Sequence, residues 1–484
     1  MIEKKRFSGK VLFLGYGAVA QCTLPLFLDH IEVPWENITV IDMKDYSRRI
    51  SKTKTGIRFR RRTVTRSNLD AILTQFVGDN GLLVDLAWNI GAQEIIGWCH
   101  RHNTLYANTS VEAWDPYAET KVLDKTLYHR QMGLRKMIAH WPSDSPTAIV
   151  DHGANPGLIS SFAKQGLSDI ADKLLSNGEL KEELKEKVAH YRSVGDFAHL
   201  AYALGVKVIH CSERDTQITR RPRRVGEFVN TWSIAGFHEE GTAPTELGWG
   251  THELKLPPNA FQHPEGPKNQ IALAQMGINT WHRSFVPDVG EVEGMIIRHG
   301  EAFGLSDFLT VRDQSGEPIY RPTVHYVYMP CHEALSSLAE LRARGYEIQE
   351  FQRIMTRELT SGEDFVGAFI MGHKYNAWWT GSILDIKEAR ESVPSSNATT
   401  LQVAAGMIAA LMWAIDNPRK GLCLPEALPH DYVLDVARKY LGELRSEPYD
   451  WTPLQNRKVF FPENPSCDID KKDPWQFECF LDPN

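Results

Sequence analysis

Residues 10 to 20 read KVLFLGYGAVA, and this segment gives the clearest indication of the fold class. The apolar run before the glycines is typical of a strand that is buried on both faces of a parallel sheet. A helical pattern follows from Ala18 to about His30, with Pro25 as a predicted kink. The two glycines therefore stand at a strand-to-helix turn, which predicts the start of a doubly wound α/β domain.

Outward from this turn, short apolar runs alternate with helical patterns. NITVIDM (37–43) predicts the second strand and contains Asp42 near its end. Further strands are expected at 58–65, 81–88 and 104–110, and helices at 67–77 (capped by Ser67), 91–102 and 118–141. TAIVDHGANPG (147–157) predicts a last strand that runs into a turn. The alternation indicates a Rossmann-type parallel sheet with a boundary just beyond Gly157.

A second, α+β domain is expected between about 160 and 390, where short strands, helices and long loops mix. After it, LQVAAGMIAALMWAI (401–415) predicts a buried helix, with Asn397 or Thr399 as the candidate N-cap. This run is too short to cross a bilayer, so we expect the helix to return to the first domain. The predicted division is 1–157 with 395–484 as a discontinuous dinucleotide-binding domain, and 158–394 as an inserted substrate-binding and dimerisation domain.

The composition is that of an ordinary folded protein, and it excludes several classes of partner. In 484 residues, 61 Asp and Glu outnumber 54 Lys and Arg, and this net charge of −7 disfavours nucleic acid. The basic runs at 58–62 and 220–224 could bind phosphate, but with an acidic total and no interleaved aromatics we expect them to be solvated surface or to form local ion pairs. Seven scattered cysteines form neither a disulfide framework nor a CxxC pair, which favours a reducing cytoplasm. No targeting segment and no membrane partner are predicted.

No metal site is predicted either. His210–Cys211 and Cys331–His332 are adjacent pairs, but neighbouring side chains on a strand point to opposite faces. No second pair stands at the spacing that a metal site needs.

GYGAVA (15–20) fits the pattern G-x-G-x-x-A, in which glycines let a pyrophosphate approach the backbone at a helix N-terminus. Asp42 follows at the end of the next strand, where an acid binds the ribose hydroxyls and repels a 2′-phosphate. NAD is therefore expected as the cofactor rather than NADP; the alternative is a glycine turn that binds no ligand. The candidate cofactor-binding residues of this motif are Gly15, Gly17, Ala18, Val19, Ala20 and Asp42.

The expected second domain concentrates tryptophans and acids in four segments, namely 212–217, 229–241, 244–253 and 361–369. A carboxylate supplies charge to a cation, and the face of a Trp adds roughly 0.5 to 2 kcal/mol. Any one of these tryptophans could instead pack in the core, and any one acid could lie on the surface. The clustering favours a site for an organic cation.

Read together, GYGAVA, DHGANPG, CSERDTQ, VNTWSIAGFHEEG, ELGWGTHE, HGEAFGLSDFLTVRD, YRPTVHY, GHKYNAWW and NATTLQV resemble the bacterial homospermidine synthases over nearly the whole chain. The first two motifs also occur in the saccharopine and carboxynorspermidine dehydrogenases. The resemblance implies an NAD-containing enzyme, typically a homodimer, that joins two putrescines into sym-homospermidine and releases ammonia. Spermidine is an alternative donor, and there is no net redox change.

The resemblance also implies roles for individual residues. Trp232 would hold cationic charge over the reacting centre, with Glu240 and Glu213 as carboxylates at the inner amine. His299 would be a hydrogen-bond partner or proton shuttle near the middle of the channel, and Asn155 would orient substrate or nicotinamide.

Four further positions carry expectations. Glu112 and Asp364 would take the outer ammonium, and Thr109 would contact the cofactor. Asn89 stands where some relatives carry an acid, so the number of carboxylates around the amine is left open.

The chemistry of amines agrees with this scheme. An alkyl amine has a pKa near 10.4 and arrives charged, yet only a neutral amine releases hydride. The site must therefore hold one ammonium group and deprotonate the other nitrogen. Two other interpretations remain: a net dehydrogenase of the saccharopine or carboxynorspermidine kind, and a non-catalytic protein that binds NAD or polyamines.

Overall fold

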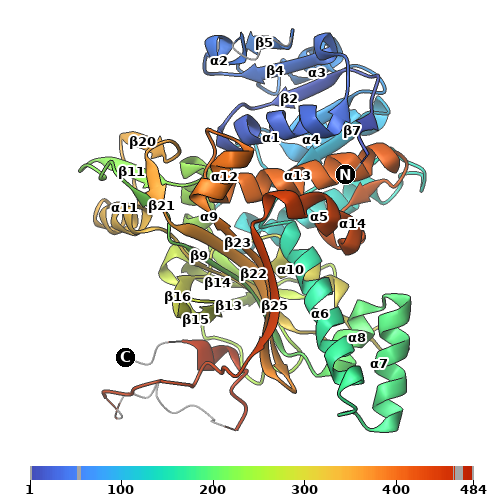
Figure 1. Ribbon diagram of the computed structural model, residues 1–484, viewed down its shortest axis with the longest axis vertical. Helices are drawn as coiled ribbons and strands as arrows, with labels where there is room; N and C mark the ends of the chain where they lie inside the picture. The colour runs from blue at the N-terminus through green and yellow to red at the C-terminus, as the bar shows by residue number, and fades with distance from the viewer. Residues whose placement is uncertain (1–2, 52–55, 462, 464–471, 482–484) are drawn as a thin grey trace.

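The computed structural model describes residues 3–51, 56–461, 463 and 472–481. Two sheets dominate it, and they lie one above the other along the long axis of the molecule (Figure 1). The upper, blue sheet is formed mainly by the N-terminal part of the chain, and the lower sheet by the middle part. The expected combination of a Rossmann-type sheet with a second α+β unit is confirmed.

The upper sheet has seven strands in the order β24-β8-β7-β6-β2-β4-β5, and every pairing is parallel. All four residues of β2, VLFL, are buried, because β2 lies inside the sheet and helices cover both of the sheet's faces. Its strands are β2 (Val11–Leu14), β4 (Ile38–Asp42), β5 (Arg58–Arg61), β6 (Leu82–Asp85), β7 (Leu105–Asn108), β8 (Ala148–Ile149) and β24 (Leu422–Cys423).

The helices of this unit differ from the sequence prediction at their ends. The helix expected at 118–141 is α5, and it begins only at Leu127 because the Thr126 side chain accepts a hydrogen bond from the His129 N–H. Asn68, not Ser67, precedes α3. Pro25 lies inside α1, which is continuous. The helices are α1 (Ala18–His30), α2 (Ser47–Ser51), α3 (Leu69–Phe76), α4 (Ala92–Arg101) and α5 (Leu127–Ile138).

The lower sheet has ten strands, eight of them in the order β13-β14-β12-β19-β9-β22-β23-β25, while β16 pairs with β19 and β15 pairs with β16. The central pair β9 and β19 is parallel and the other pairings are antiparallel. Its strands are β9 (Val208–Asp215), β12 (Pro244–Gly248), β13 (Ala260–Gln262), β14 (Gln270–Met276), β15 (Trp281–Val286), β16 (Gly290–Met295), β19 (Thr323–Met329), β22 (Glu363–His373), β23 (Asn376–Asp385) and β25 (Glu443–Tyr449).

Helices and four small two-stranded sheets complete the described part of the chain. The helices are α6 (Leu158–Ser176), α7 (Glu182–Val194), α8 (Phe197–Leu204), α9 (Ile234–Thr242), α10 (Glu301–Phe308), α11 (His332–Ala343), α12 (Ile386–Ser392), α13 (Ala398–Asp416) and α14 (His430–Ala437). The small sheets pair β1 (Lys5–Arg6) with β3 (Ile31–Glu32), β10 (Ile218–Thr219) with β21 (Leu359–Ser361), β11 (Glu227–Asn230) with β20 (Phe351–Ile354), and β17 (Val311–Arg312) with β18 (Pro318–Tyr320).

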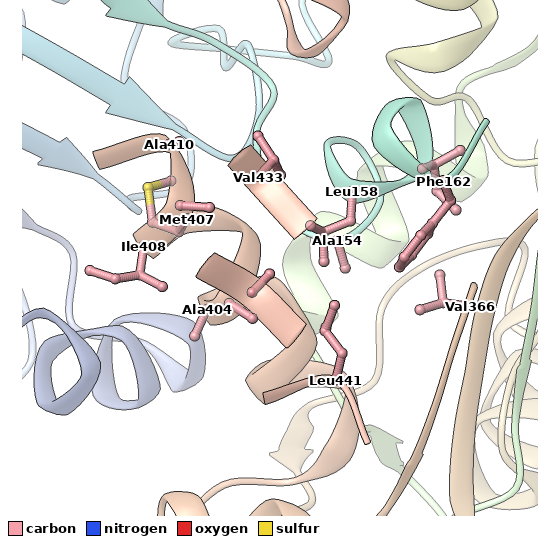
Figure 2. Close-up of a cluster of buried hydrophobic side chains, with 14 of the residues drawn as sticks. Ala154, Leu158, Phe162, Val366, Ala404, Met407, Ile408, Ala410, Val433 and Leu441 are labelled. Carbon is pink, nitrogen blue, oxygen red and sulfur yellow. The ribbon is translucent and has the colours of Figure 1, made fainter. Parts of the chain in front are cut away.

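Helix α13 joins the two units, and it is the buried helix expected at 401–415. Asn397, one of the two expected N-caps, caps it through a capping box with Thr400, and the helix begins at Ala398. By length and composition it could cross a membrane, but 89% of its apolar window is buried inside the protein. It lies between the two sheets, against α1 and the 154–162 segment (Figure 2). The helix is therefore a core element that fixes one sheet against the other.

The C-terminal part of the chain is shared between the sheets. β24 pairs with β8 in the upper sheet, as expected if 395–484 returns to the first domain. The prediction placed all of this segment there, but β25 pairs with β23 in the lower sheet. The chain crosses over between Cys423 and Glu443, because the open edge of β23 offers β25 a complete antiparallel ladder from Leu444 to Tyr449.

Candidate functional site

Two adjoining cavities lie between the sheets. The first, which we call the acidic cavity, has a volume of about 160 Å³ and is lined by Glu112, Asn155, Glu213, Trp232, Glu240, His299, Tyr326 and Asp364 among others. The second, the glycine-turn cavity, has a volume of about 450 Å³ and is lined by Gly15, Gly17, Ala18, Val19, Ala20, Asp42 and Asn89 among others. Both are lined by Val19, Leu86, Ala87, Trp88 and Ser233, so a ligand in one can touch a ligand in the other.

The glycine-turn cavity fits a dinucleotide. Gly15 has a φ of 86°, and a Cβ there would lie 2.7 Å from the carbonyl oxygen of Leu86. A Cβ on Gly17 would meet nothing within 4 Å, because it would project into the open cavity. No side chain caps the following helix, so its first N–H groups are available to an anion.

Asp42 closes this cavity at the end of β4. Its carboxylate accepts hydrogen bonds from the backbone N–H groups of Tyr16 and Lys44, each at 2.7 Å. These two bonds fix the carboxylate at the edge of the cavity and leave its remaining lone pairs for hydroxyl donors. Lys44 and Arg62 line the same cavity. The sequence prediction did not include Lys44, and it expected Arg62, in the basic run 58–62, to lie on the solvated surface.

In the acidic cavity, Glu213 of β9 is held by two donors. Its Oε2 accepts hydrogen bonds from the Tyr326 hydroxyl at 2.7 Å and from Asn155 Nδ2 at 3.1 Å. Burial raises the pKa of Glu213 to about 7, although both hydrogen bonds oppose the shift. Glu213 can therefore gain or lose a proton near neutral pH.

Asp364 of β22 lies beside Glu213 at the neighbouring strand. Its Oδ2 accepts a hydrogen bond from the Thr399 hydroxyl of α13, while its Oδ1 is buried without a hydrogen-bond partner among the described residues. Burial, followed by the charges of Glu213 and Asp215, raises the pKa of Asp364 well above its usual value. An ammonium group placed here would offset both the cost of burying the Asp364 carboxylate and its repulsion by Glu213 and Asp215.

Among the described residues, Glu240 of α9 is a cavity carboxyl with an unpaired buried oxygen. Although 23% of its side chain is accessible, its Oε2 is buried and has no hydrogen-bond partner in the described part of the chain. Burial and the neighbouring charge of Glu239 raise the pKa of Glu240 well above its usual value. His299 Nε2 lies 4.0 Å from this oxygen, and His299 Nδ1 lies 3.2 Å from Glu301 Oε2.

Trp232 stands directly before the N-cap of α9. Its indole N–H donates to the Tyr328 hydroxyl at 2.9 Å, and its ring packs against Phe237 at 5.1 Å between centroids. These contacts hold the indole at the cavity wall. Because it lines the same cavity as the carboxyls, it can take the cation–π role expected for it.

The other predicted residues lie at one or the other of the two cavities. Glu112 lines the acidic cavity, where burial raises its pKa, and accepts hydrogen bonds from the Ser110 hydroxyl and the Asn89 N–H. Thr109, expected at the cofactor, lines the acidic cavity, which adjoins the glycine-turn cavity. Asn89, expected to bind substrate, lines the glycine-turn cavity with a positive φ of 63°, and its N–H donates to Glu112 of the acidic cavity.

Sequence reasoning missed residues that hold the predicted ones in place. Tyr326 and Tyr328 of β19 support Glu213 and Trp232, and Trp88 lines both cavities. The strand β6 ends at Asp85 rather than at Trp88, so the loop that follows is free to line the site. The i, i+2 spacing of the tyrosines in HYVYM was the available signal, since such residues share one face of a strand.

The structure brings His210 together with two histidines that are distant in sequence, His282 and His325. His282 Nδ1 and His325 Nε2 are 2.9 Å apart, and His210 Nδ1 contacts the Ser284 hydroxyl. The outer nitrogens His282 Nε2 and His325 Nδ1 have no hydrogen-bond partner among the described residues, whereas histidines that bind metals usually donate from that nitrogen. We therefore regard the three rings, which line neither cavity, as a hydrogen-bonded core cluster.

Comparison with known proteins places the chain in a family. The saccharopine dehydrogenase NADP binding domain matches residues 11–149, and the saccharopine dehydrogenase C-terminal domain matches residues 153–449. Homospermidine synthases from Mesorhizobium japonicum and Blastochloris viridis are each 37% identical to this chain over 98% of its length, covering 96% and 98% of those proteins.

A solved structure agrees with these relatives. The homospermidine synthase of Legionella pneumophila, crystallised in complex with NAD, superposes with a TM-score of 0.87 at 36% identity, over 99% of this chain and 98% of that one. Cavities, sequence and fold thus point to one group, and the chain belongs to the homospermidine synthase family.

Proposed function

We propose that this protein is a homospermidine synthase that uses NAD to transfer an aminobutyl group between two putrescines. The observation that carries the proposal is the acidic cavity, in which a Trp ring and four carboxyls with raised pKa values adjoin a dinucleotide turn. Carboxyls that share a small cavity are poorly ionised alone and become well ionised beside a diammonium ligand. The site therefore favours an amine with two positive ends.

The reaction begins with binding. Asp364 and Glu213, whose charges interact, hold one ammonium group of the first putrescine, and Glu112 contributes charge near Glu240. This assignment differs from the expected one, in which Glu213 lay at the inner amine and Glu112 shared the outer ammonium with Asp364. Glu240 takes a proton from the reacting nitrogen, since its raised pKa makes its carboxylate a good acceptor. Bound NAD supplies the acceptor for the hydride that leaves the adjacent carbon and later returns the same hydride.

The protein then stabilises an iminium carbon. Trp232 offers its ring face to that positive charge. The neutral amine of the second putrescine adds to the carbon, ammonia leaves, and the new iminium is reduced at the same carbon. Two putrescines thus give one homospermidine and one ammonia, without net redox change.

His299 passes protons between the two carboxyls that flank it, Glu240 and Glu301. Asn155 orients Glu213 through its amide N–H. The hydrogen bond from Asn155 keeps Glu213 aimed at the substrate nitrogen, whereas His299 is hydrogen-bonded to Glu301 and lies 4.0 Å from Glu240.

Mass spectrometry of products from isotopically labelled putrescine with NAD tests the proposal. We expect labelled homospermidine and one ammonia per turnover, with no lasting change in absorbance at the nicotinamide band. Stoichiometric consumption of reduced cofactor with a keto acid or aldehyde would indicate a net dehydrogenase instead. Binding of NAD and putrescine without any product would indicate a non-catalytic binding protein.

We further propose a cytoplasmic homodimer, with the 158–394 unit as the dimerisation domain and polyamines other than putrescine as additional substrates. The six cysteines in the described residues are free, which supports a reducing compartment; Cys467 lies outside the described residues. Light scattering on the purified protein tests the dimer: the mass of a single 54.9 kDa chain would contradict it.

A further inference from the structure

A buried ion cluster lies directly behind the acidic cavity. Glu239 Oε1 accepts hydrogen bonds from Arg130 Nη2 at 2.6 Å and from Arg298 Nη2. The three side chains are almost inaccessible, at 12% for Arg130, 1% for Arg298 and 6% for Glu239. Charges removed from water so completely are costly, so their retention calls for an explanation beyond stability.

Each member of this cluster is linked to a residue of the cavity wall. Glu239 precedes Glu240 on α9, and Arg298 precedes His299 after β16. Arg130 Nη1 donates at 2.9 Å to the carbonyl of Val111, which precedes Glu112. One ion cluster thus connects three separate segments, each at the position next to a side chain that lines the acidic cavity.

We propose that Glu239, Arg130 and Arg298 form a positioning cluster for the proposed reaction, holding Glu240, His299 and Glu112 in the cavity and setting the charge that Glu240 faces. The inference rests on the proposed function, because it takes Glu240 as the proton acceptor. None of the three members lines the cavity, so they act through their neighbours and not on the substrate.

The charges around Glu240 come from four segments. They are Glu239 on its own helix, Arg130 on α5, Arg298 and His299 after β16, and Glu112 in the loop after β7. Burial raises the pKa of Glu240 most, then the charge of Glu239, while Arg298 opposes the shift. Burial would raise the pKa of Glu239 as well, but the two arginines outweigh it and lower that pKa, so Glu239 stays ionised.

Opposite shifts are therefore expected from two substitutions. Glu239→Gln removes an anion beside Glu240 and leaves two arginines facing it, so Glu240 ionises at lower pH. Arg298→Met removes a cation, so Glu240 ionises at higher pH. A charge at this range shifts a pKa by about one to three units, and the acidic limb of the pH profile should move by about one pH unit or more in each variant.

The experiment measures kcat for homospermidine formation and, separately, putrescine binding, each between pH 5.5 and 9.5 on the NAD-loaded protein. We expect the acidic limb of the pH profile to shift to lower pH in Glu239→Gln and to higher pH in Arg298→Met. In Arg298→Lys it should return to its original pH. Glu227→Gln is the matched control, because Glu227 is equally buried and bonded to Arg353 but lines neither cavity.

Acidic limbs that stay in place, or that move in the same direction in both variants, would overturn the inference, since an ion pair with a purely structural role would change stability without moving the limb of kcat in opposite directions. If Arg298→Met does not fold, Arg130→Met takes its place with the same expected direction. If the unaltered protein binds putrescine but forms no homospermidine, the proposed function fails, while the binding limb still tests the cluster.

Discussion

At the residue scale, Trp232 combines two functions that substitution can separate. Phe at this position keeps an aromatic face but loses the hydrogen bond to Tyr328, whereas Ala keeps neither. We expect kcat to fall about 3- to 10-fold in Trp232→Phe and about 30-fold or more in Trp232→Ala, as the loss of roughly 2 kcal/mol of cation–π attraction requires. Trp249→Phe is the control, because Trp249 lines neither cavity. Equal values of kcat in both Trp232 variants and in the parent would show that the Trp232 ring contributes packing and no cation–π stabilisation.

A second prediction concerns the selection of the cofactor by Asp42. A carboxylate at this position repels a 2′-phosphate, so NAD should bind at least about tenfold more tightly than NADP. Asp42→Ser removes the repulsion and leaves Lys44 and Arg62 at the same cavity, so the affinity for NADP should rise. Titration by fluorescence measures both affinities. The gain should disappear when Arg62→Met is added, and equal binding of the two cofactors by the parent would contradict the role of Asp42.

At the element scale, α13 approaches the 153–157 turn so closely at Gly406 that a side chain at this position would overlap the backbone of the turn. A Cβ on Gly406 would lie 2.0 Å from the carbonyl oxygen of Gly153. Gly406→Ala should therefore cost about 1 to 3 kcal/mol of stability and displace Asn155, which would lower both the thermal midpoint and kcat.

Gly97→Ala in α4 provides the matched control for this substitution. The atoms nearest a Cβ on Gly97 lie at 3.6 Å, so this change should leave the midpoint unchanged or raise it, as expected for Ala replacing Gly within a helix. A Gly406→Ala protein as stable and active as the Gly97→Ala protein would contradict the close packing.

Elements whose pattern is local were predictable, and elements that depend on distant partners were not. The run before Gly15 is apolar at every position, so its burial in a parallel sheet could be predicted from the run alone. The order of the lower sheet could not, because β9 pairs with β19 and β22, which lie more than a hundred residues further along the chain. For the same reason Glu213 was found from its motif, while its partner Tyr326 was not.

At the scale of the whole molecule, the site exists because α13 holds two sheets at a fixed distance. Thr399 and Gln402 of this helix donate to Asp364 in the lower sheet, while the helix packs against α1, which follows the glycine turn. The hydride and the amine therefore meet at a junction rather than within one sheet, which is where both cavities share Val19 and Trp88.

The buried titratable groups make the stability of the whole protein depend on pH. Burial raises the pKa of six carboxyls to about 7, those of Asp85, Asp151, Glu213, Glu246, Glu253 and Glu426. In the unfolded chain these groups ionise near pH 4. The folded protein therefore holds more protons than the unfolded chain, and this contribution to stability is lost as pH rises through about 7.

Buried histidines oppose this effect, but only at lower pH. Burial lowers the pKa of His152, His252 and His373 to about 4, so their contribution to stability is complete once pH exceeds the ordinary value of about 6.5. Above pH 6.5 the six carboxyls dominate, and the buried Lys164, whose pKa burial lowers to about 8, opposes them only near the top of the range. We expect the thermal midpoint of the ligand-free protein to fall between pH 6.5 and 8. Saturating putrescine should reduce the fall, because its ammonium groups stabilise ionised Glu213, Glu240 and Asp364. A midpoint that rises over this range would contradict the raised pKa values of the buried carboxyls. A fall that putrescine leaves unchanged would contradict the assignment of Glu213, Glu240 and Asp364 to the amine site.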